Sequence, residues 1–120
     1  MQSFGMTLLL QDDAEKSRRY RELHQKVWPV VTDRIRSVGI DGMEIFLIGR
    51  RLFMYMTTTD EFNPAVDFAR LDDDPEYRKW STLTASLQAA APEAREGEWW
   101  TLMDKVFDLG WPQHLAGSRK

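Results

Sequence analysis

The chain has 120 residues, a formal net charge of −3 and no cysteine. This length corresponds to one domain that can form a hydrophobic core without covalent support. The charge argues against a nucleic-acid partner, and the lack of cysteine excludes disulfides and thiolate chemistry. We find no signal peptide and no segment that can span a membrane, so a cytoplasmic location is the default expectation.

The first third of the chain predicts a strand followed by an interrupted helix. The apolar run Phe4–Leu10 is typical of a buried strand. Asp12 or Asp13 is the expected N-cap of the helix that follows. Pro29 has no backbone N–H group and its ring clashes with the preceding turn, so the helix must kink or restart there. Gly39 suits the left-handed position that ends a helix.

The middle of the chain predicts a hairpin and two further helices. Met43–Ile48 and Leu52–Thr58 are strand-like and are separated by the short sequence GRR, which indicates a hairpin. A short helix is expected over Asn63–Leu71. The next helix is expected to continue through the sequence QAAA, with Asp74 as its N-cap and Pro75 in its first turn.

The last apolar segment, Trp99–Leu109, is rich in strand-forming residues, but its alternation is imperfect. It is expected to be a strand with a bulge, or a strand buried on both faces. Residues 110–120 are expected to form a frayed tail, which leaves a single domain over residues 1–109.

The order strand, helix, strand, strand, helices, strand predicts a ferredoxin-like α+β fold. This is the split βαβ arrangement, an antiparallel sheet with helices on one face. The opposite face is expected to be too apolar for water. A homodimer through that face or a sheet edge, or a cavity on that face, would resolve this. The residues expected on it are Phe46, Phe53, Tyr55 and the methionines Met43, Met54 and Met56.

One helical face carries both apolar residues and a histidine. Residues at steps of three or four share this face: Tyr20, His24, Val27, Val31, Ile35 and Val38. The unperturbed pKa of histidine, about 6.5, suits proton transfer at neutral pH. Tyr20 lies one turn earlier, where its hydroxyl can reach the same bound molecule. A core histidine bonded to a backbone carbonyl fits the same pattern, so the residues alone leave both interpretations open.

The five tryptophans are Trp28, Trp80, Trp99, Trp100 and Trp111. Most tryptophans belong to cores or interfaces. Adjacent Trp99 and Trp100 on a strand would face opposite sides of it, so both sides of that strand are expected to be enclosed. Aromatic rings pack well against the C–H faces of sugars. Glu98 precedes this pair, either as a loop cap or as a hydrogen-bond acceptor or second proton-transfer group.

Several common motifs are missing from the sequence. It has no glycine-rich phosphate loop, no G-x-S-x-G motif and no pair of histidines at metal-ligand spacing. The second histidine, His114, falls in the tail. A transition metal is therefore not expected, and any chemistry is expected to use histidine, tyrosine and carboxylate groups without a cofactor.

Four segments together resemble the L-rhamnose mutarotase family, and especially its branch acting on L-fucose and related deoxy sugars. They are YRELHQKVWPVV, GIDGMEIFLIGRRLFMY, DPEYRKW and GEWWTLMDKVFDL, and the resemblance spans Phe4–Leu109. It implies a dimeric ferredoxin-like fold of the α+β barrel type and cofactor-free interconversion of the α and β anomers of a monosaccharide. It also implies that His24 is the principal acid–base group and that Tyr20 contacts the sugar.

The resemblance extends to further positions. Trp80 matches the second residue of a family Trp-Trp pair, whereas Lys79, Met43 and Asp108 stand where the family has Trp, Tyr and His. The substrate-binding residues expected from the pattern and the resemblance are Trp80, Trp99, Trp100, Glu98, Lys79 and Met43. Trp28 is expected to pack at the helix break. The alternatives are a dimeric ferredoxin-like monooxygenase or haem-degrading protein, and a sugar-binding or regulatory dimer without catalysis.

Overall fold

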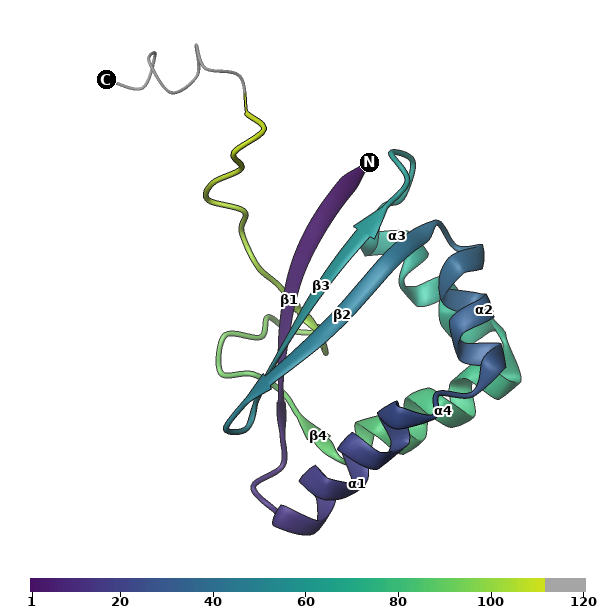
Figure 1. The fold of residues 1–120 in the computed structure, drawn as a ribbon, viewed down its shortest axis with the longest axis vertical. Coiled ribbons are helices and arrows are strands. Elements are labelled where there is room, and N and C mark those ends of the chain that lie inside the picture. Colours follow the sequence, from purple (N-terminus) through teal and green to yellow (C-terminus); the bar gives the residue numbers. More distant parts are fainter. Residues whose placement is uncertain (112–120) are drawn as a thin grey trace.

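An antiparallel sheet forms one layer of the molecule, and helices cover one of its faces (Figure 1). The computed structural model describes residues 1–111, so His114 and most of the expected tail lie outside the described residues. The elements in chain order are β1 (Gln2–Leu10), α1 (Ala14–Gln25), α2 (Pro29–Ser37), β2 (Ile40–Ile48), β3 (Arg51–Thr58), α3 (Pro64–Asp67), the 3₁₀ helix η1 (Ala69–Asp73), α4 (Pro75–Ala85), β4 (Gln88–Ala89) and β5 (Thr101–Leu102).

The strand order is β2-β3-β1-β4, with β5 also paired to β1. The central strand β1 runs antiparallel to β3 from Gln2 opposite Thr58 to Leu9 opposite Arg51. The β2–β3 hairpin turns at Gly49, whose φ of 58° favours glycine. This order, with the helices on one face, confirms the ferredoxin-like α+β fold.

The helix boundaries follow from their capping residues. The Asp13 carboxylate accepts the backbone N–H groups of Glu15 and Lys16 at 3.0 and 3.1 Å, which fixes the start of α1. At Pro29 the chain does not kink one helix but starts a second one, α2. Gly39 ends α2 with a φ of 101°. Within residues 1–111, no helix is long and apolar enough to cross a membrane.

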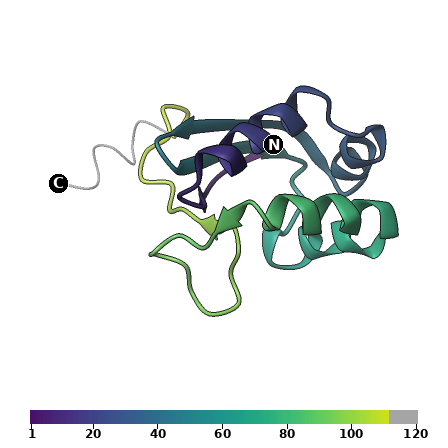
Figure 2. The same ribbon diagram turned by 90° about the horizontal axis from the view of Figure 1, so that it is seen from below.

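The helix α4 lies alongside α2 (Figure 2) and is capped by Asp74, as expected. It ends at Ala85, earlier than predicted. Residues 88–89 form the short strand β4, which pairs with the end of β1 at Leu9 and Leu10. The helical interpretation of this stretch was wrong because backbone pairing to β1 outweighs the helix propensity of its alanines.

The prediction of a strand over Trp99–Leu109 was also wrong in its extent. Only Thr101 and Leu102 pair with β1, and both tryptophans precede the paired residues. A strand needs a partner for its backbone groups, and among the described residues the last backbone bond from this segment to β1 joins the Met103 N–H to the Gly5 carbonyl at 2.8 Å. Beyond Met103 the chain leaves the sheet (Figure 1), and Phe107 is 66% exposed.

The two faces of the sheet differ in burial. Side chains of alternate residues point to opposite faces, and the inward set forms the core: Met6, Leu8, Leu10, Leu52, Met54 and Met56 are all buried. Met54 and Met56 therefore do not belong to the outer face, and neither does Met43, which pairs with Met56. The outer face does carry Phe46 and Tyr55, as predicted.

Candidate functional site

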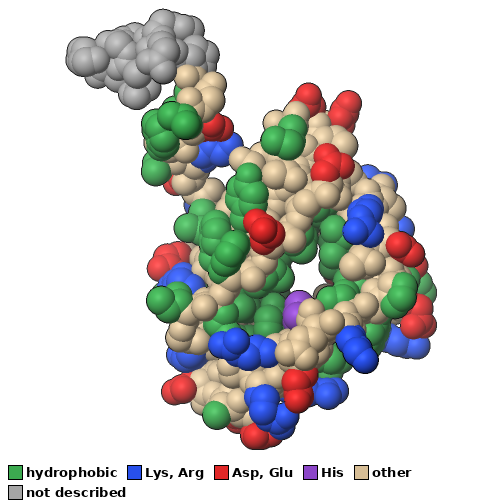
Figure 3. All heavy atoms as spheres, viewed as in Figure 1, with side chains coloured by type: hydrophobic (Ala, Val, Ile, Leu, Met, Phe, Trp, Pro, Cys, Tyr) green, Lys and Arg blue, Asp and Glu red, His purple; other side chains and the backbone are tan. Residues whose placement is uncertain are grey.

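A cavity of about 1290 Å³ lies between the inner face of the sheet and the helices. Figure 3 shows the molecule hollowed at this place, with hydrophobic side chains around the opening. The sheet contributes apolar residues such as Met6, Ile45 and Met54, whereas α1 and α4 contribute polar side chains. A cavity of this kind, apolar with a few convergent polar groups, is typical of a small-molecule site.

His24 lies in the last turn of α1 and lines this cavity. Its Nδ1 is 2.8 Å from the backbone carbonyl oxygen of Tyr20. A carbonyl oxygen only accepts hydrogen bonds, so Nδ1 carries the proton and Nε2 keeps its lone pair. The imidazole stacks on the Tyr20 ring, with centroids 4.1 Å apart, and meets the edge of Trp80 at 5.3 Å.

Burial lowers the pKa of His24 below its ordinary value of 6.5, and the bond to the Tyr20 carbonyl opposes this shift only in part. The desolvated imidazolium is disfavoured because the aromatic rings around it replace water. At neutral pH the side chain is therefore a neutral imidazole, with Nε2 able to accept a proton.

Two tyrosine hydroxyls line the same cavity. Burial raises the pKa of Tyr20 to about 12, although the Gln88 side chain acts in the opposite direction. The pKa of Tyr77 is also raised to about 12, first by burial and then by the charge of Asp72. Both phenols therefore stay protonated at neutral pH and act as hydrogen-bond donors rather than bases.

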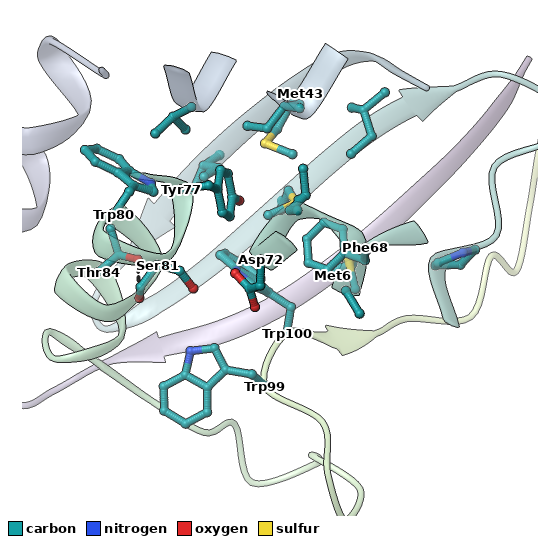
Figure 4. Close-up of a pocket in the computed structure, with 18 of the residues that line it drawn as sticks. Met6, Met43, Phe68, Asp72, Tyr77, Trp80, Ser81, Thr84, Trp99 and Trp100 are labelled. Atoms are coloured by element: carbon teal, nitrogen blue, oxygen red, sulfur yellow. Dashed lines mark hydrogen bonds between the residues drawn. The ribbon is translucent and has the colours of Figure 1, made fainter. Parts of the chain in front are cut away.

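Tryptophan side chains from α4 and from the loop before β5 form part of the cavity walls (Figure 4). Trp80, on α4, is 6% exposed and meets Trp28 edge-on at 5.2 Å. Trp28 caps α2 directly before Pro29, so it packs at the helix break as expected. Trp99 and Trp100, from the loop before β5, also line the cavity, but Trp99 is 41% exposed and is not enclosed as predicted.

Glu98 lines the cavity but is bound to its own loop. Its carboxylate accepts the backbone N–H groups of Arg95 at 2.9 Å and Leu102 at 3.5 Å, and the Arg95 guanidinium at 3.2 Å. The bond from the Arg95 backbone is the main cause that lowers the pKa of Glu98. At neutral pH it is a carboxylate that holds the loop, which matches the loop-cap interpretation.

The last two expected substrate-binding residues lie in different places. Met43 lines the cavity on β2. Lys79 is on the outer surface of α4, where its Nζ lies 3.0 Å from Glu76 and its side chain is 68% exposed. It does not line the cavity, because the helical face toward the cavity carries Tyr77, Trp80, Ser81 and Thr84, and Lys79 lies on the opposite side of α4.

Sequence reasoning missed several polar residues of this cavity. Tyr77, Ser81 and Thr84 line it with Trp80, and their spacing of three or four residues is a signal that could have identified a shared helical face. Gln88 had no such signal because its segment was interpreted as helix. Within residues 1–111, no group of three or more acidic or histidine side chains is arranged to hold a metal ion.

Known proteins share both sequence and fold with this chain. The sequence model describing L-rhamnose mutarotases matches residues 3–109. An L-fucose mutarotase of Xanthomonas campestris is 36% identical over 111 residues, covering 91% of this chain and 89% of that protein. A UPF0734 protein of Dictyostelium discoideum is 37% identical over 113 residues, covering 91% and 90%. The crystal structure of an L-rhamnose mutarotase from Formosa agariphila shares the fold, with a TM-score of 0.67 at 16% identity, over 91% of this chain and 99% of that chain.

Proposed function

The chain belongs to the L-rhamnose mutarotase family, and from this membership and the cavity geometry we propose that it interconverts the anomers of a 6-deoxy sugar by proton transfer at His24. The sugar is one such as L-fucose or L-rhamnose. The observation that carries the proposal is the neutral imidazole with an unoccupied Nε2, held between Tyr20 and Trp80 at the wall of the cavity.

Mutarotation opens and closes a cyclic hemiacetal. A base takes the proton of the anomeric O–H group while the bond between the anomeric carbon and the ring oxygen breaks, and an acid gives a proton to that oxygen. The new carbonyl group rotates, and the hydroxyl group then attacks the opposite face of the carbonyl carbon. The ring closes with the proton transfers reversed. Nε2 of His24 serves as the base, and general acid–base catalysis of this kind typically contributes about 10²–10⁴-fold.

The tyrosines complement the histidine. Because the pKa of Tyr20 and of Tyr77 is about 12, each presents an O–H donor to sugar oxygens throughout the neutral range. Tyr20 is the nearer partner of His24, since their rings are stacked, so it orients the anomeric end of the sugar or supplies the proton to the ring oxygen. Hydrogen bonds to developing charge in a site shielded from water are among the stronger contributions to catalysis.

The remaining walls bind the carbon skeleton. Trp80, Trp99 and Trp100 offer aromatic surface to the C–H faces of the ring. The apolar floor around Met43 and Met54 suits the methyl group that distinguishes a 6-deoxy sugar from a hexose with a hydroxyl at this carbon. The carboxylate of Glu98 holds the loop that carries two of these tryptophans.

The test is exchange spectroscopy of anomeric protons by NMR. The panel contains L-fucose, L-rhamnose and their epimers, and it begins with L-fucose because the Xanthomonas campestris relative is named for that sugar. Exchange between the anomeric resonances of at least one sugar should be faster with protein than with buffer alone. If no sugar on the panel exchanges faster, the proposal fails. Binding by calorimetry without faster exchange would indicate a sugar-binding protein.

The proposal includes a homodimer formed through the outer face of the sheet. Phe46, Ile48 and Tyr55 on this face are 55%, 81% and 39% exposed. Met103 lies on the same face, with its sulfur 3.7 Å from the position of a Cβ on Gly5. Monomers rarely expose contiguous apolar patches of this kind, and a sheet face can meet its own copy about a two-fold axis.

A further inference from the structure

Gln88 is a buried polar residue between two parts of the cavity wall. It opens β4 opposite Leu10 of the central strand and is 5% exposed. Its side-chain Oε1 accepts a hydrogen bond from the indole Nε1–H of Trp99 at 2.8 Å. Gln88 also lines the cavity together with Tyr20.

A glutamine side chain can serve two neighbours because its amide has an acceptor at one position and a donor at the other. The oxygen of Gln88 is engaged by Trp99. The amide nitrogen is a donor on the wall of the cavity that Tyr20 also lines. Gln88 thus ties the loop that carries Trp99 to β4 at this wall.

We infer that Gln88 is a positioning residue for anomeric exchange, which fixes the Trp99 indole at the wall of the cavity that Tyr20 and His24 also line. The inference rests on the proposed function and adds a residue to it. Trp99 needs such a partner because it lies in an irregular segment and is 41% exposed. Since its N–H is committed to Gln88, Trp99 offers the sugar its ring carbons and not a donor. Pairing of β4 with β1 places this link on a regular element of the sheet.

The first measurement follows the Trp99 indole N–H resonance in ¹⁵N-labelled protein, assigned with Trp99→Phe. Gln88→Met keeps the shape of the side chain but removes both amide functions. We expect the resonance to move and its exchange with water to accelerate in this variant. Gln88→Glu keeps an oxygen acceptor, so the resonance should stay near its original position. Gln2→Met is the matched control, because the Gln2 amide also bonds from a strand to a distant segment, at 2.8 Å to the Phe62 carbonyl, but does not line the cavity.

The second measurement separates KM from kcat for the sugar that exchanges fastest. Loss of one neutral hydrogen bond that orients a wall typically reduces kcat/KM by about 3- to 10-fold. For Gln88→Met we expect this loss to appear mainly in KM. In Gln88→Glu the added carboxylate should shift the acidic limb of the pH profile toward higher pH, because an anion in the wall of the cavity that His24 lines favours its imidazolium form. A residue that only supports the fold would not change the pH profile in this way.

The results distinguish the inference from the proposed function. If Gln88→Met leaves both the indole resonance and KM unchanged while the wild type exchanges sugars, the inference is overturned and the proposed function stands. If the wild type does not accelerate exchange of any sugar, both fail, and a shifted resonance then reports only a structural bond. If Gln88→Met does not fold, as judged by circular dichroism, the pH profile of Gln88→Glu decides, and an unchanged profile overturns the inference.

Discussion

The backbone carbonyl of Tyr20 accepts a hydrogen bond from Nδ1 of His24 at 2.8 Å, while the ring of the same Tyr20 stacks on the imidazole at 4.1 Å. One residue therefore sets both the tautomer and the plane of the histidine. The bond lies within a single turn of α1, between the His24 side chain and the carbonyl four residues earlier. Nε2 is the only ring nitrogen left for a ligand.

Replacement of His24 by Ala should abolish most of the acceleration of anomeric exchange, a loss of about 10²–10⁴-fold in rate, because no other described side chain offers a neutral base in this cavity. His24→Asn is the informative companion, since its amide can still donate to the Tyr20 carbonyl but cannot accept a proton at the Nε2 position. Both variants should fold, as judged by circular dichroism. If His24→Ala were unfolded and His24→Asn fully active, His24 would be a core residue and not the base.

The pH dependence of exchange follows from the lowered pKa of His24. Only the neutral imidazole accepts a proton, so activity should fall as the pH drops through the folded-state pKa. Because burial places that pKa below 6.5, activity should persist below pH 6.5 and decline at lower pH. The alkaline side should stay flat through the neutral range, since both cavity tyrosines titrate near 12. Rates from NMR exchange across the acidic range check this, and a midpoint above 6.5 would contradict it.

The same shift predicts a dependence of stability on pH. Below pH 6.5 the His24 side chain of the unfolded chain binds a proton before that of the folded chain does, so the unfolded state gains protons and the free energy of unfolding decreases. The decrease begins near the unfolded value of 6.5 and ends below the folded-state pKa. Urea denaturation of the wild type and of His24→Asn across this range isolates the effect, because the variant lacks the titrating group. Equal slopes in both proteins would exclude this contribution.

The local structure around the site was predictable where a residue type forces one backbone choice. Asp13, Pro29 and Gly39 set the helix boundaries, and the spacing of Tyr20 and His24 placed both on the inward face. Gln88 could not be identified, because a two-residue strand is decided by its partner β1 and not by its own propensity.

The sequence also did not predict which of several neighbouring residues face the cavity. Family resemblance assigned Lys79 beside Trp80, but Lys79 lies on the outer surface of α4, whereas Trp80 lines the cavity. The segment after Met103 was interpreted as part of a strand, with a bulge or with both faces buried, because it is rich in strand-forming residues. In the structure it lies outside the sheet, and Val106 is 86% exposed.

Truncation of Trp80 should therefore destabilise the protein strongly, whereas truncation of Lys79 should have little effect. Trp80→Ala removes a buried indole that contacts both His24 and Trp28, which should lower the free energy of unfolding by about 3–5 kcal/mol. Lys79→Ala removes an exposed side chain whose ion pair with Glu76 contributes less than about 1 kcal/mol, so stability and KM should stay near wild type. Urea denaturation and exchange kinetics of the two variants check this. A large rise in KM for Lys79→Ala would restore a substrate-binding role for that lysine.

Phe46→Glu should convert the proposed dimer to monomers. Phe46 is 55% exposed on the outer face and packs against Phe53 with ring centroids 6.1 Å apart, so the substitution leaves the inner core intact. In a two-fold interface one substitution introduces two facing carboxylates, and such like-charge contacts cost on the order of several kcal/mol. Size-exclusion chromatography with light scattering should give twice the chain mass for the wild type and a single chain mass for the variant. Lys79→Glu introduces the same carboxylate group on the outer surface of α4 and should leave the dimer unchanged. A monomeric wild type at high protein concentration would refute the dimer, and equal masses for wild type and Phe46→Glu would place the interface elsewhere.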